Sequence, residues 1–455
     1  MQNTNIVCER DTIFAQSSAK GKSGVTVFRV SGANALDCLT FLCKNFKKIS
    51  LVPRKVYLKK IYSTVHDVLI DNALIIYFNS PHSFTGEDIV EIQTHGSIII
   101  TKMILEELSL IDNFRMANPG EFARRAFLNN KFDLTSAEGL SDLIESETVL
   151  QHKQAIKQFS GVMYGIYDSW RSKLIKIQSL LEAYIDFPDE DIPPHIMDDA
   201  KLEINFLRND LKTAVNDNRR GERLRSGITV SILGHPNVGK SSLINYLTNR
   251  DVSIVSDIAG TTRDIVETYI DIGGYPIIIA DTAGIRKTED KIESLGIERA
   301  IKKASESDLK IVLFDQHSKN FYETFNNIID QNTILVRNKI DTDYSYDSSQ
   351  NSMHFCDLYN ISLKENIGLE KLLKGIEYKL SSIVSHDDNS IITRVRHRNQ
   401  VNDALGHLMR CDIDGDLVCA AEDIRLSIRS LSILVGKIEV DEILGEIFSN
   451  FCIGK

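Results

Sequence analysis

The chain has 455 residues, more than the roughly 250–300 at which a single hydrophobic core stops growing, so we expect two to four domains. Its 42% hydrophobic and 25% charged residues are ordinary globular values, and a formal net charge of −10 argues against nucleic-acid binding through the overall electrostatic field. Seven scattered cysteines without a CxxC pair argue against a disulfide framework or a zinc site and favour a reducing, cytoplasmic compartment, and neither a secretory signal nor a membrane span is predicted.

Residues 1–128 alternate strand-like and helix-like runs. Val25–Val30 and Ile89–Thr94 alternate apolar and polar residues as half-buried strands do, and Ala73–Phe78 has the pattern of a buried strand. Residues 98–110 have helical spacing. We therefore predict an N-terminal α/β domain, in which no nucleotide-binding motif occurs.

The pattern then becomes helical. From Leu134 to Phe187 apolar residues recur at three- and four-residue steps, and Leu202–Val215 continues as an amphipathic helix. The charged stretch 218–227 is typical of a linker. After about residue 385 the chain is helical again, for example over Ile424–Val435.

One local group of basic residues offers a candidate RNA contact in this acidic chain. It comprises Arg394, Arg396, His397 and Arg398. The alternative interpretation is the solvated face of a helix.

Between the helical stretches lies an α/β unit with four apolar strands, which predicts a mostly parallel sheet covered by helices. The strands are Thr229–Leu233, Ile277–Ala280, Ile311–Phe314 and Thr333–Val336. We predict a domain inserted into another domain. The boundaries would be 1–128 for the N-terminal domain, 129–223 plus 385–455 for the split helical domain, and 224–384 for the insert.

A phosphate-binding loop is predicted at Gly234–Ser241, whose sequence GHPNVGKS fits G-x-x-x-x-G-K-[ST] between a strand and a helix. Its glycines let backbone N–H groups wrap a phosphate, and the helix N-terminus adds positive potential. Lys240 should reach the β- and γ-phosphates, and the Ser241 hydroxyl should bind Mg²⁺.

Asp281-Thr282-Ala283-Gly284 ends the next apolar strand. Asp281 would hold Mg²⁺ through water, and the Gly284 N–H would meet the γ-phosphate.

Asn338-Lys339-Ile340-Asp341 follows another strand and predicts selection of guanine. The Asp341 carboxylate would accept two N–H bonds from the base, whereas adenine offers no such pair. Lys339 would stack over the base. Ser362-Leu-Lys364 is placed where a backbone N–H could meet guanine O6.

The group that activates water is not obvious. Ile285 stands where small regulatory GTPases place a Gln, so another side chain must orient the water. The acidic candidates are Glu289, Asp290 and Glu293.

The transferring phosphoryl group also needs a cation. Oxygen atoms of Asn237 and of residues 256–262 would form a potassium site, with Thr262 as a second Mg²⁺ ligand. Arg263 is the alternative cation, although Asp264 beside it would pair with it.

Long blocks of the sequence, in order, resemble the MnmE (TrmE) family of tRNA modification GTPases. The blocks are Asp11–Gln16, Gly24–Gly32, Ser83–Asp88, Pro119–Leu128, Ile185–Glu190, Gly260–Asp264 and Phe451–Lys455. The resemblance covers nearly the whole chain. It implies a potassium-dependent GTPase whose G domains dimerise across the nucleotide.

Site residues follow from this resemblance. It assigns potassium binding to Asn237, Ser256, Ile258 and Thr261, and it assigns Glu293 to the positioning of the attacking water. The remaining expected nucleotide contacts are Val238, Gly239, Ser242, Asp257, Ala259, Gly260, Thr282 and Ala283.

The family also implies a constitutive homodimer whose N-terminal domain binds 5-formyl- or methylene-tetrahydrofolate. Arg29, Glu87, Lys131 and Lys455 match its folate contacts. Cationic side chains suit the glutamate tail of a folate, and a carboxylate suits its pterin edge. The resemblance treats Cys452 as functional near the modification site, and a bland buried cysteine is the alternative.

The sequence thus predicts a GTPase that acts with an FAD-dependent partner, MnmG (GidA) in the family, in a heterotetramer or larger complex. Together they would add an aminomethyl-type or carboxymethylaminomethyl group to C5 of the wobble uridine of certain tRNAs. The alternatives are a regulatory ribosome-assembly GTPase and a degenerate relative that binds GTP without turnover.

Overall fold

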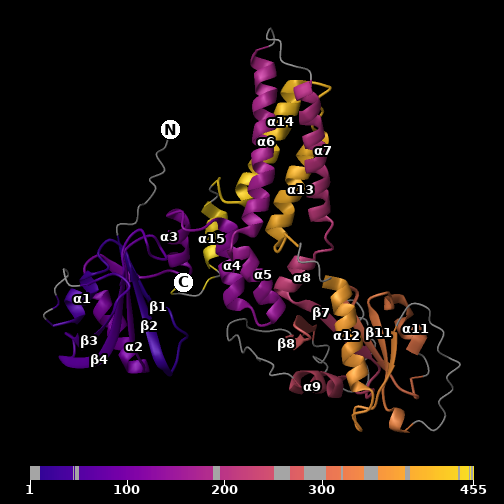
Figure 1. Ribbon diagram of the computed structural model, residues 1–455. Coiled ribbons are helices and arrows are strands. Elements are labelled where there is room, and N and C mark those ends of the chain that lie inside the picture. Colours follow the sequence, from indigo (N-terminus) through magenta and orange to yellow (C-terminus); the bar gives the residue numbers. More distant parts are fainter. Residues whose placement is uncertain are drawn as a thin grey trace. The chain divides into compact units, whose positions relative to one another are not determined.

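The computed structural model describes residues 11–44, 46, 51–187, 195–250, 267–280, 304–318, 321–342, 357–384, 390–438, 441–449, 451 and 454 (Figure 1). The chain divides into two compact units. The first comprises residues 1–141, 159–165 and 435–455, and the second comprises 142–158 and 166–434. Within the described residues, no helix is both long and apolar enough to cross a bilayer.

The first unit contains a six-stranded sheet in the order β3-β4-β5-β2-β1-β6. Its strands are β1 Thr12–Gln16, β2 Ser23–Ser31, β3 Val56–Ser63, β4 Val68–Phe78, β5 Ile89–Gly96 and β6 Phe114–Met116. All neighbours pair antiparallel except β1 and β6, which are parallel. The helices α1 Asp37–Leu42 and α2 Ile98–Ser109 share a buried core with these strands. The three predicted strands and the predicted helix of this region are confirmed.

The C-terminal helix packs within the same unit. Helix α15 (Asp441–Ser449) contacts α3 (Glu121–Leu128), and Phe448 and Phe451 lie in one apolar cluster with Leu134 of α4 (Leu134–Glu145). Gly120 has a φ of 65°, and a Cβ there would come within 2.3 Å of the Phe448 carbonyl oxygen. A side chain at this position would therefore push the C-terminal helix away.

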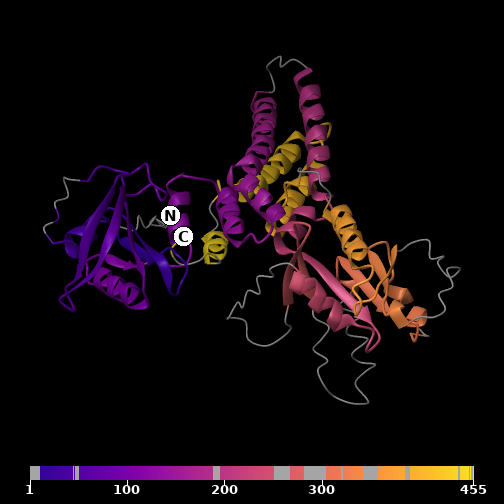
Figure 2. The ribbon, with the colours of Figure 1, turned by 60° about the horizontal axis from the view of Figure 1, so that its bottom comes forward.

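The second unit contains a bundle of long helices. They are α5 Val149–Phe159, α6 Val162–Asp186, α7 His195–Val215, α13 Val395–Arg410 and α14 Leu417–Leu434. Helix α13 lies against both α7 and α14 (Figures 1 and 2). Tyr167 of α6 packs edge-on to His397 of α13, with ring centroids 6.0 Å apart.

The same unit contains a second six-stranded sheet in the order β12-β11-β10-β7-β9-β8. The strands are β7 Ile228–Gly234, β8 Glu267–Ile272, β9 Tyr275–Ala280, β10 Leu309–Phe314, β11 Thr333–Arg337 and β12 Asp357–Asn360. Only β8 is antiparallel to its neighbour. Helices α9 Lys240–Arg250, α11 Phe321–Phe325 and α12 Leu369–Val384 accompany it. The predicted mostly parallel sheet is confirmed.

The predicted linker at 218–227 is wrong, because Arg220–Ser226 forms helix α8. Its charges are paired in the folded chain: Arg223 Nε donates to Asp308 Oδ1 at 2.7 Å, and Arg225 Nε donates to Asp142 Oδ1 at 2.7 Å. A charged stretch becomes a helix here because carboxylates of neighbouring elements neutralise it.

Both interpretations of the basic group near residue 396 are also wrong. Arg394 Nη2 donates to Asp142 Oδ1 at 2.6 Å, Arg398 donates to Asp217 and Glu222, and His397 is fully buried. The group is neither an exposed RNA contact nor a solvated face, because its charges hold elements of the second unit together.

Candidate functional site

The phosphate-binding loop connects β7 to α9, as the sequence predicts. Gly234, Asn237 and Gly239 all have positive φ values, of 146°, 62° and 106°. A Cβ on Gly234 would lie 2.3 Å from the Leu313 carbonyl oxygen, and one on Gly239 would lie 2.4 Å from Nδ2 of Asn338. Glycine is required at both positions by backbone conformation and by close packing. The backbone of the loop therefore packs closely against Leu313 of β10 and against Asn338.

Lys240 begins helix α9 and turns its side chain back into the loop. Its Nζ donates to the carbonyl oxygens of Gly234 and His235, each at 2.9 Å. Burial lowers the pKa of the Lys240 ammonium. The charge thus lies at the centre of the loop that the sequence assigns to phosphate.

Asn338 joins the phosphate loop to the segment that follows β12. Its Nδ2 donates to the Val238 carbonyl oxygen at 2.8 Å, and its Oδ1 accepts the Leu363 N–H at 3.2 Å. The side chain is almost fully buried. Three chain segments predicted to touch one nucleotide are therefore fixed together by a single amide. The Leu363 N–H donates to Asn338 in the structure, whereas the sequence predicted that a backbone N–H of this region could contact guanine O6.

The predicted base-recognising carboxylate is exposed and oriented. Asp341 Oδ1 accepts the Ser362 hydroxyl at 2.6 Å. This hydrogen bond lowers the pKa of the Asp341 carboxyl and orients it. An ionised, outward carboxylate is the acceptor that two guanine N–H groups require.

Lys339 lies on the other side of the same turn with a φ of 64°. Its Nζ donates to Asp315 Oδ2 at 2.8 Å. Burial acts to raise the pKa of Asp315, but the bond from Lys339 and others outweigh it and lower that pKa. Asp315 thereby fixes the lysine stem beside Asp341, which is the position predicted for stacking on a base.

Several predicted residues lie outside the described residues. They are the potassium and switch residues Ser256, Asp257, Ile258, Ala259, Gly260, Thr261 and Thr262, the strand-end group Asp281, Thr282, Ala283 and Gly284, and Glu293, Cys452 and Lys455. Ser241 and Ser242 are described in the first turn of α9. The roles assigned to the residues outside the described ranges stay predictions.

The predicted folate residues of the first unit gather around the loop 79–88. Arg29 Nη2 donates to Glu91 Oε1 at 2.9 Å, and its guanidinium carbon lies 5.3 Å from the Phe84 ring centroid and 5.8 Å from that of Phe122. Lys131 Nζ donates to the Pro81 carbonyl oxygen at 2.8 Å. Both cations therefore border the same loop, and an aromatic ring lies beside one of them.

Glu87, the third predicted folate residue, is engaged inside the protein. Ser31 Oγ donates to its Oε2 at 2.7 Å, and Arg125 Nη1 lies 3.2 Å from both carboxylate oxygens. Arg125 also donates to Glu121, which Arg115 contacts in turn. Burial acts to raise the pKa of Glu121, but the hydrogen bond from Arg115 and other contacts lower it to about 2. A buried network of charges thus underlies the loop.

Sequence reasoning missed the residues that orient the site. Glu91, Phe84 and Asp315 were not singled out, because no local pattern in the sequence marks them. Glu91 lies opposite Arg29 on paired antiparallel strands, and Asp315 directly follows a buried strand that pairs with the strand before Asn338. Strand order was needed to see either relation.

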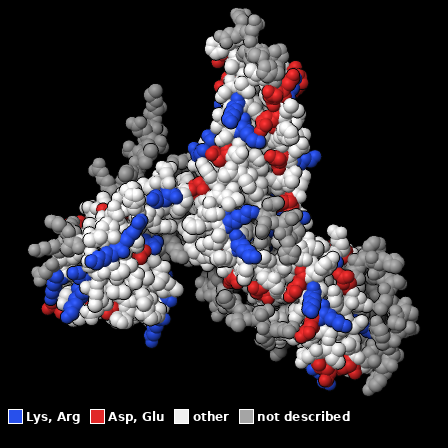
Figure 3. All heavy atoms as spheres, viewed as in Figure 1, with Lys and Arg blue, Asp and Glu red and all other residues white. Residues whose placement is uncertain are grey.

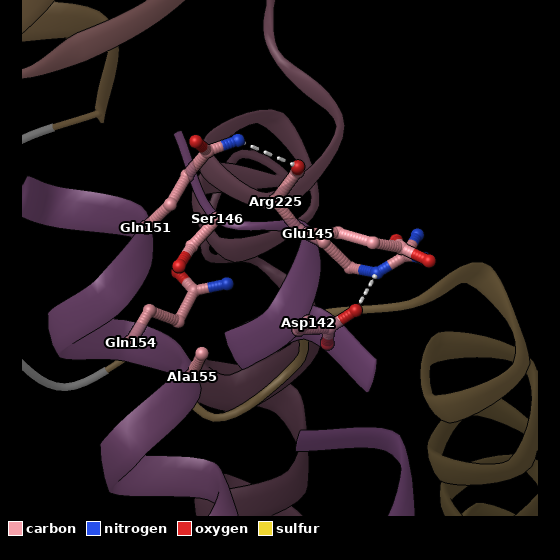
Figure 4. Close-up of a pocket in the computed structure, with 7 residues that line it drawn as sticks. All are labelled: Asp142, Glu145, Ser146, Gln151, Gln154, Ala155 and Arg225. Atoms are coloured by element: carbon pink, nitrogen blue, oxygen red, sulfur yellow. Dashed lines mark hydrogen bonds and ion pairs between the residues drawn. The ribbon is translucent and has the colours of Figure 1, made fainter. Parts of the chain in front are cut away.

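A pocket also lies at the junction of α4, α5 and α8, and none of the residues that line it is a predicted site residue (Figure 4). Its lining residues are Asp142, Glu145, Ser146, Gln151, Gln154, Ala155 and Arg225. Gln151 Nε2 donates to the Arg225 carbonyl oxygen at 3.1 Å, and Gln154 Nε2 donates to that of Gly221 at 3.0 Å. These bonds attach α5 to α8, which leads directly into β7 and the phosphate loop.

The chain matches two family models and is similar to named proteins over nearly its whole length. Residues 12–131 match the family model described as the GTP-binding protein TrmE N-terminus, and residues 134–452 match the MnmE helical domain. A Rickettsia akari (strain Hartford) protein named tRNA modification GTPase MnmE is 51% identical over 98% of this chain and 100% of its own length. A protein of the same name from Orientia tsutsugamushi (strain Boryong) is 50% identical over 98% of this chain and 99% of its own.

Solved structures match the chain over shorter parts. The G domain of the Thermotoga maritima FeoB iron transporter aligns with 35% of this chain and 99% of its own, at 24% identity and a TM-score of 0.27. Aquifex aeolicus Era bound to GDP·AlF4⁻ aligns with 40% of this chain and 66% of its own, at 26% identity and a TM-score of 0.26.

Proposed function

This chain belongs to the MnmE family of tRNA modification GTPases, and we propose that it hydrolyses GTP in the course of modifying tRNA. The observation that carries the proposal is the pair of bonds made by Asn338, which fasten the phosphate loop to the base-recognising segment. A carboxylate oriented by the Ser362 hydroxyl completes a site suited to guanine.

The proposed hydrolytic machinery depends on two cations and one carboxylate. Ser241 and Thr262 would hold Mg²⁺, and Asn237, Ser256, Ile258 and Thr261 would hold K⁺. Hydroxyl, amide and carbonyl oxygens are suitable donors for hard cations. Asn237 fits this role because it is an exposed residue of the phosphate loop, so its side-chain oxygen is accessible to a cation. Glu293 would position the attacking water.

GTP turnover in potassium and in sodium buffers tests this proposal. We expect turnover to be faster in potassium, and we expect Glu293→Ala to reduce it on the order of 10²–10³-fold, because a positioned proton-handling group contributes about that much. Nucleotide affinity should change little, since Glu293 is assigned to water and not to the base or phosphates. Glu306→Ala, an exposed carboxylate just before β10, is the control.

Equal turnover in both salts would remove the potassium assignment and make Arg263 the next candidate for the cation. An unaffected Glu293→Ala variant would return the role to Glu289 or Asp290. Bound GTP without any turnover in the unmodified protein would favour the degenerate relative.

The first unit is proposed to bind a reduced folate as a one-carbon donor. Lys131 supplies a cation for a carboxylate, Arg29 would add a second although it is also paired with Glu91, and Phe84 supplies an aromatic surface beside Arg29. Lys455 would add a third cation. Such charge-assisted hydrogen bonds are stronger than neutral ones, which gives the bordering cations a large share of the affinity.

Lys131→Gln tests the folate assignment, because Lys131 is exposed and its loss leaves no buried charge behind. We expect binding of 5-formyl-tetrahydrofolate, measured by calorimetry, to weaken about tenfold or more, as the loss of a hydrogen bond to a charged group predicts. Lys102→Gln on α2 is the control. Equal affinity of the two variants and the unmodified protein would contradict the assignment.

The finer chemistry is proposed from the family alone. The chain would act as a homodimer with an FAD-dependent partner of the MnmG type, in a heterotetramer or larger complex. Together they would install an aminomethyl-type or carboxymethylaminomethyl group on C5 of the wobble uridine, with Cys452 near the reaction.

A regulatory ribosome-assembly GTPase is the alternative function. It would share the guanine site but would need no folate. Folate binding by the unmodified protein therefore separates the two functions.

A further inference from the structure

One stretch of the N-terminal unit is strongly basic in an otherwise acidic chain. Between Cys38 and His66 the sequence has seven Lys and Arg residues and no Asp or Glu, although the whole chain carries a formal net charge of −10. The structure describes five of these cations: Lys44, Arg54, Lys55, Lys59 and Lys60. We call these five residues the basic edge.

The basic edge follows the outermost strand of its sheet. Lys59 and Lys60 lie on β3, which pairs only with β4, and consecutive residues of a strand point to opposite faces. Arg54 and Lys55 lie just before this strand, and Lys44 follows α1, which contacts β3. Figure 3 shows Lys and Arg side chains in blue at the part of this unit that Figure 1 labels α1 and β3.

The positive charges of the basic edge are not neutralised by carboxylates in the described part of the chain. None of the five forms an ion pair with any residue that the structure describes, whereas Arg29, Arg115 and Arg125 of the same unit are all paired with carboxylates. Arg54 donates one bond, to the His82 carbonyl oxygen at 2.9 Å, and its other N–H groups have no partner among the described residues. The edge therefore retains its positive potential for an outside partner.

Aromatic rings lie among the cations. Lys44 Nζ is 4.3 Å from the ring centroid of Tyr62, and Lys55 Nζ is 5.7 Å from that of Tyr57. Both tyrosines are half-buried, so each presents part of a rigid ring next to a charge. In both pairs the ammonium lies over the ring, so the rings hold the cations in place and the cations are what the edge offers to a partner.

Edge strands also carry lysines for another reason, namely to prevent pairing with a second sheet. Lys59 and Lys60 alone would serve that purpose, because they lie on the strand itself. Lys44, Arg54 and Lys55 lie outside β3, where no unpaired strand needs protection. Protection of the edge therefore does not account for the full set of charges.

We propose that the basic edge binds the phosphate backbone of RNA, and specifically of the tRNA that this protein acts on. The inference rests on the proposed function, which requires an acidic chain to hold a polyanion. A local patch is the only means by which such a chain attracts RNA, since its overall field is repulsive. The contact is independent of base sequence, because it is made to phosphates.

The test measures the affinity of the full-length protein for unfractionated tRNA at several salt concentrations. In the variant Lys55→Gln with Lys60→Gln, two exposed charges are removed. We expect the slope of log affinity against log salt to shrink by about 1.5, because each phosphate contact contributes roughly 0.7–0.9. At low salt the affinity should fall on the order of tenfold.

The matched control removes two exposed lysines elsewhere, through Lys102→Gln with Lys212→Gln, and should keep the slope of the unmodified protein. A quadruple variant that adds Lys44→Gln and Lys59→Gln should lose more of the slope, and gel filtration shows whether it remains monodisperse. GTP turnover without tRNA should be unchanged in every variant.

Unchanged affinity and slope in both basic-edge variants would overturn the proposal, and so would variants that aggregate while their soluble fraction binds tRNA normally. The proposal would also be overturned if the double variant lost binding to vesicles of anionic phospholipid but not to tRNA. An unmodified protein that neither turns over GTP nor binds tRNA would instead contradict the proposed function. If the unmodified protein turns over GTP and binds tRNA, and the variants keep its slope, only the role of the basic edge is contradicted and the proposed function is not.

Discussion

Replacing Asp341 by Asn should transfer the nucleotide preference of this GTPase from guanine to xanthine. The Asp341 carboxylate would accept from the guanine ring N–H and amino group, whereas Asn would offer an N–H donor in place of one of these acceptors. The amino group then faces a donor, so we expect affinity for GTP to fall on the order of 10⁴-fold. Xanthosine triphosphate has a carbonyl oxygen at that position and should restore binding and turnover.

The prediction is sharpened by the hydrogen bond from Ser362, which fixes one oxygen of Asp341 in place. Asp357→Asn is the control, because Asp357 is an exposed carboxylate at the start of β12 whose partner is Lys379. Affinities for both triphosphates are measured by nucleotide competition. If Asp341→Asn kept its preference for GTP, the base-recognising role of this carboxylate would be wrong.

Lys240→Ala should abolish turnover almost completely. The ammonium lies inside the phosphate loop and is the only cation that the sequence motif aims at the β- and γ-phosphates. Removal of a single preorganised hydrogen-bond donor to a transition state lowers the rate on the order of 10²–10³-fold. Lys240 carries a full charge in a half-buried site, so we expect its loss to lower the turnover rate by more than about 10²-fold. Single-turnover hydrolysis with saturating GTP and Mg²⁺ measures this effect.

Lys240 also bonds the carbonyl oxygens of Gly234 and His235. Circular dichroism and the melting temperature show whether the variant is still folded, and saturating GTP in the single-turnover assay separates a slower chemical step from weaker binding. Lys371→Ala, an exposed lysine on α12, is the control and should hydrolyse GTP normally. Turnover within tenfold of the unmodified protein would contradict the assigned role.

The sequence by itself determined the features that depend on neighbours along the chain. The phosphate loop was readable because its glycines, lysine and serine fall within eight residues between a strand and a helix. Strand and helix periodicity likewise predicted both sheets, since alternation and three-to-four-residue spacing are local consequences of which face is buried. The family resemblance then assigned Arg29, Glu87 and Lys131, although no local pattern marks those residues as a site.

Only the tertiary structure decided what depends on residues far apart in sequence. Asn338 contacts Val238 across 100 positions, and Arg394 meets Asp142 across 252 positions. Local charge predicted a linker at α8 and an exposed patch near Arg398, and both predictions failed because distant carboxylates neutralise those residues. The basic edge at β3 illustrates the converse, since its charges pair with no carboxylate among the residues that the structure describes. Whether a charge is exposed or consumed depends on its partners, and the chain brings those partners together only when it folds.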